Sequence, residues 1–160
     1  MDVEVRHARQ EDGEDLLELW HGFTAHLSSF DERYAHTESA DDRWLSYFEN
    51  QLLDSKHGTV VVAESGEDVV GVLEARVAGN HPIFRLENHG QVYGHYVAEG
   101  YRREGIGTAL LEEAADWFEA PPREVDFFRV TVIDGDEESE AAYRAEGYAP
   151  VEHVYEKRLD

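Results

Sequence analysis

The sequence predicts a mixed α/β fold with a central, mostly antiparallel sheet and helices packed on its faces. Two observations lead to this prediction. Short runs rich in β-branched and aromatic residues, which favour strands, are interspersed with longer segments whose apolar residues recur at helical spacing. The chain also has 160 residues, which is enough for one substantial hydrophobic core. We therefore expect a single domain over residues 1–160.

The N-terminal segment carries the signals of one strand followed by one helix. Residues 3–8 alternate valine with charged side chains, which predicts a half-buried strand. Asp12 or Gly13 can cap the helix that follows, because short polar residues and glycine are favoured at helix starts. The apolar face of that helix includes Leu16 and Trp20.

A second helix and a hairpin come next. Apolar residues at helical spacing predict a helix over residues 44–52. Residues 59–63 and 69–77 are rich in valine, and the turn residues 65–68 between them predict a hairpin. A polar connection over residues 78–88 should then lead to the next strand.

The second half continues the alternation. Residues 92–97 predict a strand and residues 108–118 a helix, which the proline pair 121–122 ends because proline cannot continue a helix. The Phe-, Val- and Thr-rich residues 125–133 predict another strand. A turn, a short helix over residues 139–146 and a last strand over residues 151–158 complete the order of elements.

The most informative motif is Arg-Arg-Glu-Gly-Ile-Gly at residues 102–107, between an expected strand and an expected helix. The first N–H groups of a helix lack helical partners and carry the positive end of its dipole, so they attract anions. Gly105 and Gly107 let a ligand approach the backbone closely. A dinucleotide fingerprint would need a third glycine, where Leu110 stands, and a Walker loop would need a lysine. The motif therefore indicates another kind of pyrophosphate site.

The motif resembles the R/Q-x-x-G-x-G/A loop of GNAT-type N-acetyltransferases, with Arg102, Gly105 and Gly107 at its defined positions. The order of elements over residues 59–158 is similar to that family as well. The resemblance implies a GNAT-like fold: a mostly antiparallel, twisted sheet of six to seven strands, splayed in the middle and flanked by about four helices. It also implies acetyl-CoA as the co-substrate.

The resemblance further implies the residues that bind acetyl-CoA. Main-chain groups of the strand before the loop would hold pantetheine, and the loop would hold the pyrophosphate. The expected residues are Tyr96, Val97, Ala98, Arg102, Arg103, Glu104, Gly105, Ile106, Gly107, Thr108, Ser139 and Tyr143. A surface turn that binds no nucleotide is the structural alternative for the loop.

The family often carries Asn-x-x-Ala-x-x-x-Tyr-x-x-x-Gly-Phe on its last helix. Tyr143 and Gly147 match this pattern, Tyr148 supplies the closing aromatic residue, and Asp136 and Ser139 replace the asparagine and the alanine. By resemblance, Tyr143 would donate a proton to the CoA thiolate, since a phenol of pKa about 10 keeps its proton at neutral pH.

The general base is a separate question. Gln91 stands where some family members carry a glutamate, and an amide cannot take up a proton. On a regular strand Tyr93 and His95 would share the face of Gln91. His95 is the first candidate base because its ordinary pKa is about 6.5, with a structural histidine or a pocket wall as the alternative.

The acceptor would be a small-molecule amine or a protein amine, attacked directly through a tetrahedral intermediate. A second hypothesis is an acyl-CoA-binding regulatory or interaction module with little catalysis, and a third is an α/β domain whose loop binds no nucleotide. An aromatic and acidic stretch over residues 26–36 is a candidate for acceptor contacts, against the simpler alternative of an ordinary acidic loop. Last-strand pairing into a homodimer is a further expectation from the family.

Composition narrows the class of protein. The net charge is −22, from 36 acidic and 14 basic residues, so we expect no basic face that could bind nucleic acid. Only two of the basic residues, Lys56 and Lys157, are lysines, and this acidic, lysine-poor composition resembles that of halophilic archaeal proteins. Long apolar runs, a signal peptide and cysteine are missing, so we expect no membrane partner and a cytoplasmic protein. The nine histidines show no recognised metal-binding spacing, so no metal cofactor is expected.

Overall fold

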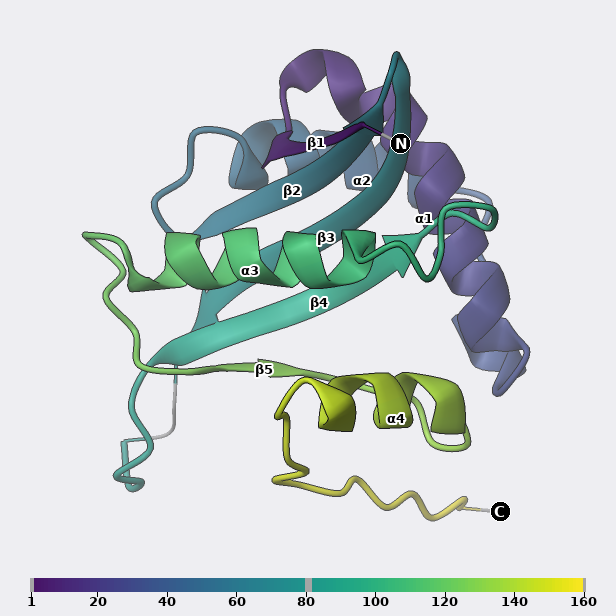
Figure 1. Ribbon diagram of the computed structural model, residues 1–160. Coiled ribbons are helices and arrows are strands. Elements are labelled where there is room, and N and C mark those ends of the chain that lie inside the picture. The colour runs from purple at the N-terminus through teal and green to yellow at the C-terminus, as the bar shows by residue number, and fades with distance from the viewer. Residues whose placement is uncertain (1, 80–81, 160) are drawn as a thin grey trace.

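The structure is a computed structural model, and it describes residues 2–79 and 82–159 (Figure 1). The described residues form one five-stranded sheet in the order β1-β2-β3-β4-β5. Its first four strands pair antiparallel, and β5 joins β4 in parallel. The strands are β1 (Val3–His7), β2 (Gly58–Ser65), β3 (Asp68–Ala78), β4 (His89–Val97) and β5 (Phe128–Val130). The predicted mixed, mostly antiparallel sheet is confirmed.

Four α-helices cover the sheet, as the sequence predicts. They are α1 (Gly13–Ser28), α2 (Ala40–Tyr47), α3 (Ile106–Glu119) and α4 (Glu137–Ala145). Two short 3₁₀ turns, η1 (Gln10–Asp12) and η2 (Glu32–Tyr34), precede α1 and α2, and a π-turn, η3 (Phe48–Leu52), follows α2. The predicted second helix therefore ends as a π-turn. None of the helices described is long and apolar enough to span a bilayer.

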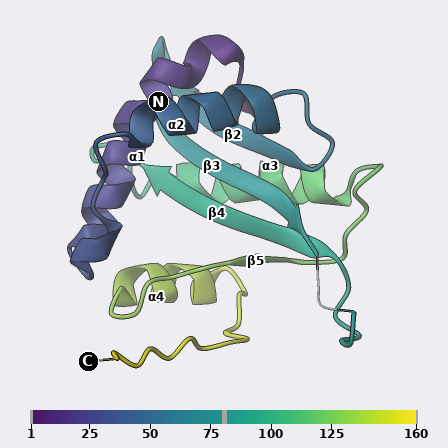
Figure 2. The same cartoon turned by 180° about the vertical axis from the view of Figure 1, so that it is seen from behind.

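Two apolar layers fix the helices on opposite faces of the sheet. On one face, Leu110 and Phe118 of α3 pack against Leu73 and Val92. On the other face, α1 and α2 cover a second cluster. Figure 2 shows these two helices in front of the sheet, from behind. The second cluster contains Leu16, Leu19, Trp20, Phe48, Leu52, Val60, Val62 and Val72. The alternation of side chains along β2 and β3 supplies both layers at once.

A β-bulge interrupts the pairing of β3 with β4. Glu74 pairs with Gly94 and Ala75 pairs with Val92, so Tyr93 lies between two registered pairs without a partner of its own. Such an extra residue turns the following side chains to the opposite face of the strand. Tyr93 consequently lines the α1–α2 face, whereas His95 faces α3. The expectation that Tyr93 and His95 share a face is therefore wrong.

The strands β4 and β5 separate after a short contact. Gly90, Gln91 and Val92 pair with β5, and the register ends there, which leaves the carboxyl half of β4 without a partner on that side. Figure 1 shows β4 rising away from β5 along this half. The contact is close at Gly90, where an added Cβ would lie 2.6 Å from the Phe118 ring.

Two strand predictions at the C-terminus are wrong. Of residues 125–133, only Phe128–Val130 form a strand, because only these residues meet a partner edge on β4. Residues 151–158 form none, and the described chain from residue 148 to residue 159 has no regular secondary structure. The side chains of Val154 and Tyr155 are 92% and 90% exposed, so these strand-favouring residues have nothing to pack on. The expected six to seven strands are therefore five.

Candidate active site

The glycine loop leads directly into the N-terminus of α3. Gly105 caps the helix with φ of 81°, a left-handed conformation that favours glycine. The first helical hydrogen bond runs from the Ala109 N–H to the Gly105 carbonyl, so the N–H groups of 106–108 precede the helical ladder. Arg102, Arg103 and Thr108 are exposed beside them, and Ile106 is buried. The loop therefore presents unpaired donors and cationic side chains together, as an anion site requires.

Arg102 also braces the loop against β4. Its Nε donates to the Val97 carbonyl at 2.9 Å, and its guanidinium lies 5.3 Å from the centre of the Tyr96 ring. The side chain therefore holds the end of β4 and the loop at a fixed distance. Arg103 has a positive φ of 65°, which turns the chain between the strand and the helix.

Main-chain groups of β4 face either β3 or the side that β5 has left. The Ala98 N–H donates to the Val70 carbonyl, and the Ala98 carbonyl accepts from Tyr101. Antiparallel pairing alternates along the strand, so the main chain of Tyr96 faces β3 and the main chains of His95 and Val97 face the open side. Of the three residues expected to offer main-chain groups, Val97 faces the open side, with His95 beside it, whereas Tyr96 and Ala98 face β3.

The two candidate catalytic side chains are in contact. His95 on β4 and Tyr143 on α4 lie 48 residues apart in sequence, and His95 Nδ1 is 2.7 Å from the Tyr143 hydroxyl. His95 Nε2 is 3.0 Å from the Gly107 carbonyl, which can only accept, so Nε2 carries the hydrogen. In a neutral ring Nδ1 is then the acceptor, and Tyr143 donates to it. This contact links β4, the glycine loop and α4.

Burial sets the protonation of this pair. It lowers the pKa of His95, despite the opposing hydrogen bond to Gly107, and so favours the neutral ring. Burial also raises the pKa of Tyr143, so the phenol keeps its proton over the whole physiological range. The neighbouring Tyr148, whose ring centre lies 5.3 Å from that of Tyr143, has its pKa raised to about 12 by burial and by Glu146.

Asp136 and Ser139 serve α4 itself. Asp136 is buried, and its carboxylate accepts from the Ser139 N–H at 3.1 Å and from the Ser139 hydroxyl at 2.7 Å, which caps the helix. His26 of α1 lies 2.7 Å from the same carboxylate. Burial opposes ionisation of Asp136, but the bonds from Ser139 and His26 outweigh it and hold its pKa below the usual value. The Ser139 hydroxyl expected to contact the cofactor is thus bonded within the cap.

A cavity of about 380 Å³ opens on the α1–α2 face, which is a size typical of small-molecule sites. Aromatic rings and two carboxylates line most of it. The lining includes Trp20, Phe23, Tyr34, His36, Asp41, Trp44, Glu74 and Tyr93. Glu74 is 8% exposed and accepts from Trp44 Nε1 at 3.0 Å. Burial raises the pKa of Glu74, although the Trp44 bond opposes it.

Sequence reasoning found part of this cavity. Tyr34 and His36, from the aromatic and acidic stretch, do line it, whereas His26 bonds Asp136 and Asp31 caps η2 through the Arg33 N–H. Glu74 was missed, although a carboxylate inside the apolar run Val72-Leu73-Glu74-Ala75 is a recognisable signal, since buried charges usually have a role. The Gln91 amide bonds the Val92 carbonyl and the Thr131 hydroxyl.

Sequence comparison identifies the family of this chain. The acetyltransferase (GNAT) family model matches residues 18–148. An uncharacterized N-acetyltransferase of Archaeoglobus fulgidus is 30% identical over 115 residues, which cover 72% of this chain and 73% of that protein.

Solved structures show the same fold at low sequence identity. An aminoglycoside N-acetyltransferase, AAC(6')-Iy in complex with CoA, superposes with a TM-score of 0.80 at 15% identity, over 99% of this chain and 95% of its own. AAC(6')-Ih from Acinetobacter baumannii gives 0.77 at 19% identity over 99% of both chains. A ribosomal-protein-alanine N-acetyltransferase from Brucella melitensis gives 0.70 at 20% identity, over 99% of this chain and all of its own. The chain is an enzyme of the GNAT N-acetyltransferase family.

Proposed function

We propose that this enzyme transfers an acetyl group from acetyl-CoA directly to a primary amine, with Tyr143 as the acid. The observation that carries the proposal is the contact of Tyr143 with His95 and, through it, with Gly107. This contact holds a protonated phenol next to the N-terminus of α3 and to the part of β4 that no longer pairs with β5. Family membership supports the reaction class, and acetyl-CoA is the typical co-substrate of the family.

The cofactor would lie along the open side of β4. The main chains of His95 and Val97 offer hydrogen bonds to the amides of pantetheine. The N–H groups of 106–108, with Arg103, would bind the pyrophosphate at the helix N-terminus. The thioester would then lie near Tyr143. The remaining loop residues, Arg102 and Glu104, shape the turn that presents these groups.

Attack by a neutral amine on the thioester carbonyl would give a tetrahedral oxyanion, whose collapse breaks the C–S bond. Tyr143 gives its proton to the departing sulfur, and its phenolate then recovers one from the ammonium nitrogen through water. His95 accepts from the Tyr143 hydroxyl and so positions it. Because His95 faces α3 while the cavity lies on the other face, His95 would take no proton from the amine and would act only by positioning Tyr143.

The acceptor would enter the cavity on the α1–α2 face. The lining carries the carboxylates of Asp41 and Glu74 beside the guanidinium of Arg33, and its aromatic walls would suit a cationic amine through cation–π contacts. The cavity volume of about 380 Å³ favours a small-molecule amine as acceptor.

Calorimetric titration of acetyl-CoA at high salt tests the proposal, beside the variant Gly105→Glu. At φ of 81° a larger residue strains the loop, and the added carboxylate repels pyrophosphate. Saturable binding that the variant loses, followed by turnover in an amine screen, is the expected result. Binding without turnover of any amine would favour an acyl-CoA-binding module instead. No binding by folded protein would refute the proposal.

We also propose a homodimer that pairs through the C-terminal segment. Residues 151–159 leave Val151, Val154, Tyr155 and Leu159 between 66% and 92% exposed. Such a row of apolar side chains on an extended chain favours strand pairing. Light scattering coupled to gel filtration should give twice the chain mass, and truncation after residue 149 should give a monomer. A monomeric full-length chain would contradict this.

A further inference from the structure

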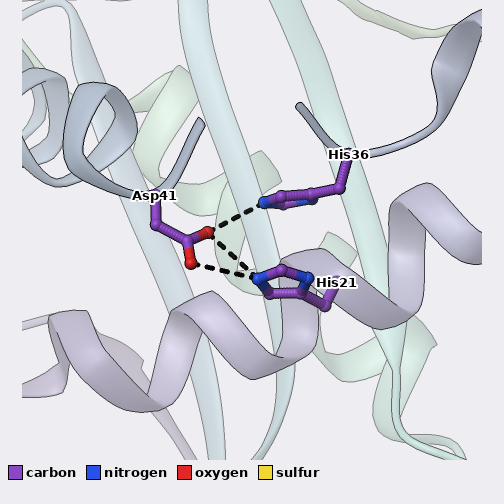
Figure 3. A group of neighbouring side chains, drawn as sticks. All are labelled: His21, His36 and Asp41. Atoms are coloured by element: carbon purple, nitrogen blue, oxygen red, sulfur yellow. Dashed lines mark hydrogen bonds and ion pairs between the residues drawn. The ribbon is translucent and has the colours of Figure 1, made fainter. Parts of the chain in front are cut away.

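Two histidines and one aspartate meet beside the cavity, away from Tyr143. His21 lies on α1, His36 lies in the connection after η2, and Asp41 lies on α2 (Figure 3). His21 Nε2 is 3.1 Å from both Asp41 oxygens, and His36 Nε2 is 2.8 Å from Asp41 Oδ1. The three ligand atoms lie within 4.8 Å of one another. The fold thus collects nitrogen and oxygen ligands that are 20 residues apart at most.

The two imidazole rings are already oriented toward a common point. They stack with centres 3.7 Å apart and planes 22° apart, and both Nε2 atoms point at the same carboxylate. Two protonated rings at this separation would repel each other. A single divalent cation shared by two neutral rings and the carboxylate removes that repulsion and balances the acidic side chain.

Thr24 supports this arrangement from behind His36. Its hydroxyl has one hydrogen, which lies within reach of the Trp20 and His21 carbonyls at 3.1 and 3.2 Å. The oxygen of Thr24 can then accept from His36 Nδ1, 2.9 Å away. With its hydrogen on Nδ1, neutral His36 has a free lone pair on Nε2, which lies 2.8 Å from Asp41 Oδ1 and could bind a cation together with that carboxylate. Metal-bound histidines are commonly oriented by such a bond at the other nitrogen.

We propose that His21, His36 and Asp41 bind one divalent transition-metal ion of the Zn²⁺ type. Two imidazoles and a carboxylate suit zinc and its neighbours rather than magnesium or calcium, which prefer oxygen ligands alone. Three protein ligands leave a fourth position of a tetrahedral ion for water or for a ligand. This inference does not depend on the proposed reaction.

A bound metal ion would stabilise the wall of the cavity that the connection between η2 and α2 forms. His36 and Asp41 line the cavity, together with Thr24 and the neighbouring Ala35 and Thr37. A metal ion joining α1 to this connection would fix its position over the opening. Water or a molecule in the cavity would supply the fourth ligand of such an ion.

The test is competition of the protein with a coloured chelator for Zn²⁺, with Co²⁺ absorption as a second readout of coordination. Wild type should bind one equivalent of Zn²⁺ and show a tetrahedral Co²⁺ spectrum, and magnesium in excess should not displace either ion. His21→Ala should weaken Zn²⁺ binding at least about 100-fold, and Thr24→Val about 10-fold, the range found for supporting partners of metal ligands. His21 is half exposed, so its removal should leave the fold intact, which thermal melting without metal checks.

The matched control is His57→Ala, which removes an exposed histidine just before β2 and should leave Zn²⁺ affinity unchanged. Equal weakening in the His21 and His57 variants would mean diffuse binding to a histidine-rich, acidic surface and would overturn the proposal. So would unchanged affinity in His21→Ala combined with His36→Ala. Loss of acetyl transfer with Zn²⁺ binding intact would refute only the proposed function, so the two can fail separately.

Discussion

Replacing Tyr143 with phenylalanine removes one hydroxyl and keeps the ring in its place against Tyr148 and the α3 layer. In the folded protein the lost group is the donor to His95 Nδ1 at 2.7 Å. The variant therefore isolates the proton of Tyr143 from its packing.

Two magnitudes follow from this geometry. Leaving the half-buried Nδ1 of His95 without its donor should cost about 1–2 kcal/mol of unfolding free energy. Removing a general acid should lower kcat about 100-fold or more, which corresponds to about 2.7 kcal/mol of barrier at 1.36 kcal/mol per tenfold. Acetyl-CoA affinity should change little, since the cofactor contacts that we propose come from main-chain groups and the loop.

The assay follows thiol release from acetyl-CoA with an accepted amine, beside calorimetric binding and urea unfolding of the same samples. Tyr148→Phe is the control, because it removes a neighbouring phenol that does not contact His95. The expected pattern is a large loss of kcat in Tyr143→Phe with binding retained, and near wild-type turnover in the control. Equal turnover of Tyr143→Phe and wild type would refute the acid role.

Three further predictions concern stability. Burial lowers the pKa of His95 in the folded protein below the unfolded value of about 6.5. The free energy of unfolding should therefore be highest above pH 6.5 and fall progressively as the pH drops toward the pKa of the folded state. Urea unfolding of His95→Gln should show a flatter pH dependence. Gly94→Ala would put a Cβ 2.5 Å from the Trp20 ring, so chemical denaturation should show a loss of about 1–3 kcal/mol, and an unchanged midpoint would contradict the packing described. With a net charge of −22, the melting temperature should rise with potassium chloride, and a flat response would argue against a salt-adapted surface.

The fold could be predicted largely from local patterns. Strands such as β2 and β3 and helices such as α1 and α3 are long enough for their periodicity to be clear. The C-terminal segment also contains strand-favouring residues, Val151, Val154 and Tyr155, yet residues 151–158 form no strand. A strand forms only where another strand offers an edge for pairing. That edge comes from residues far away in the sequence or from another copy of the chain.

The parts of the candidate site that lie within a single sequence motif could be predicted. The loop from Arg102 to Thr108 lies in one stretch of sequence, and Tyr143 occupies a fixed position in a second motif. Their contact through His95 could not be derived, because it depends on the bulge at Tyr93, and no sequence pattern marks that extra residue. The cluster of His21 and Asp41 escaped for the same reason, since it arises from the packing of α1 against α2 rather than from spacing.

The bulge in β4 also makes that strand a partition between two reactants. Tyr93, the bulge residue, faces the cavity between α1 and α2. His95, two residues later, faces α3 and Tyr143. An amine and an acyl carrier can then approach from opposite sides and meet only where β5 has turned away. Deleting Tyr93 would make the pairing of β3 with β4 regular, and it would remove a ring from the cavity while His95 still faced α3. In the proposed reaction, strand register would thus decide which side chains of β4 face each reactant.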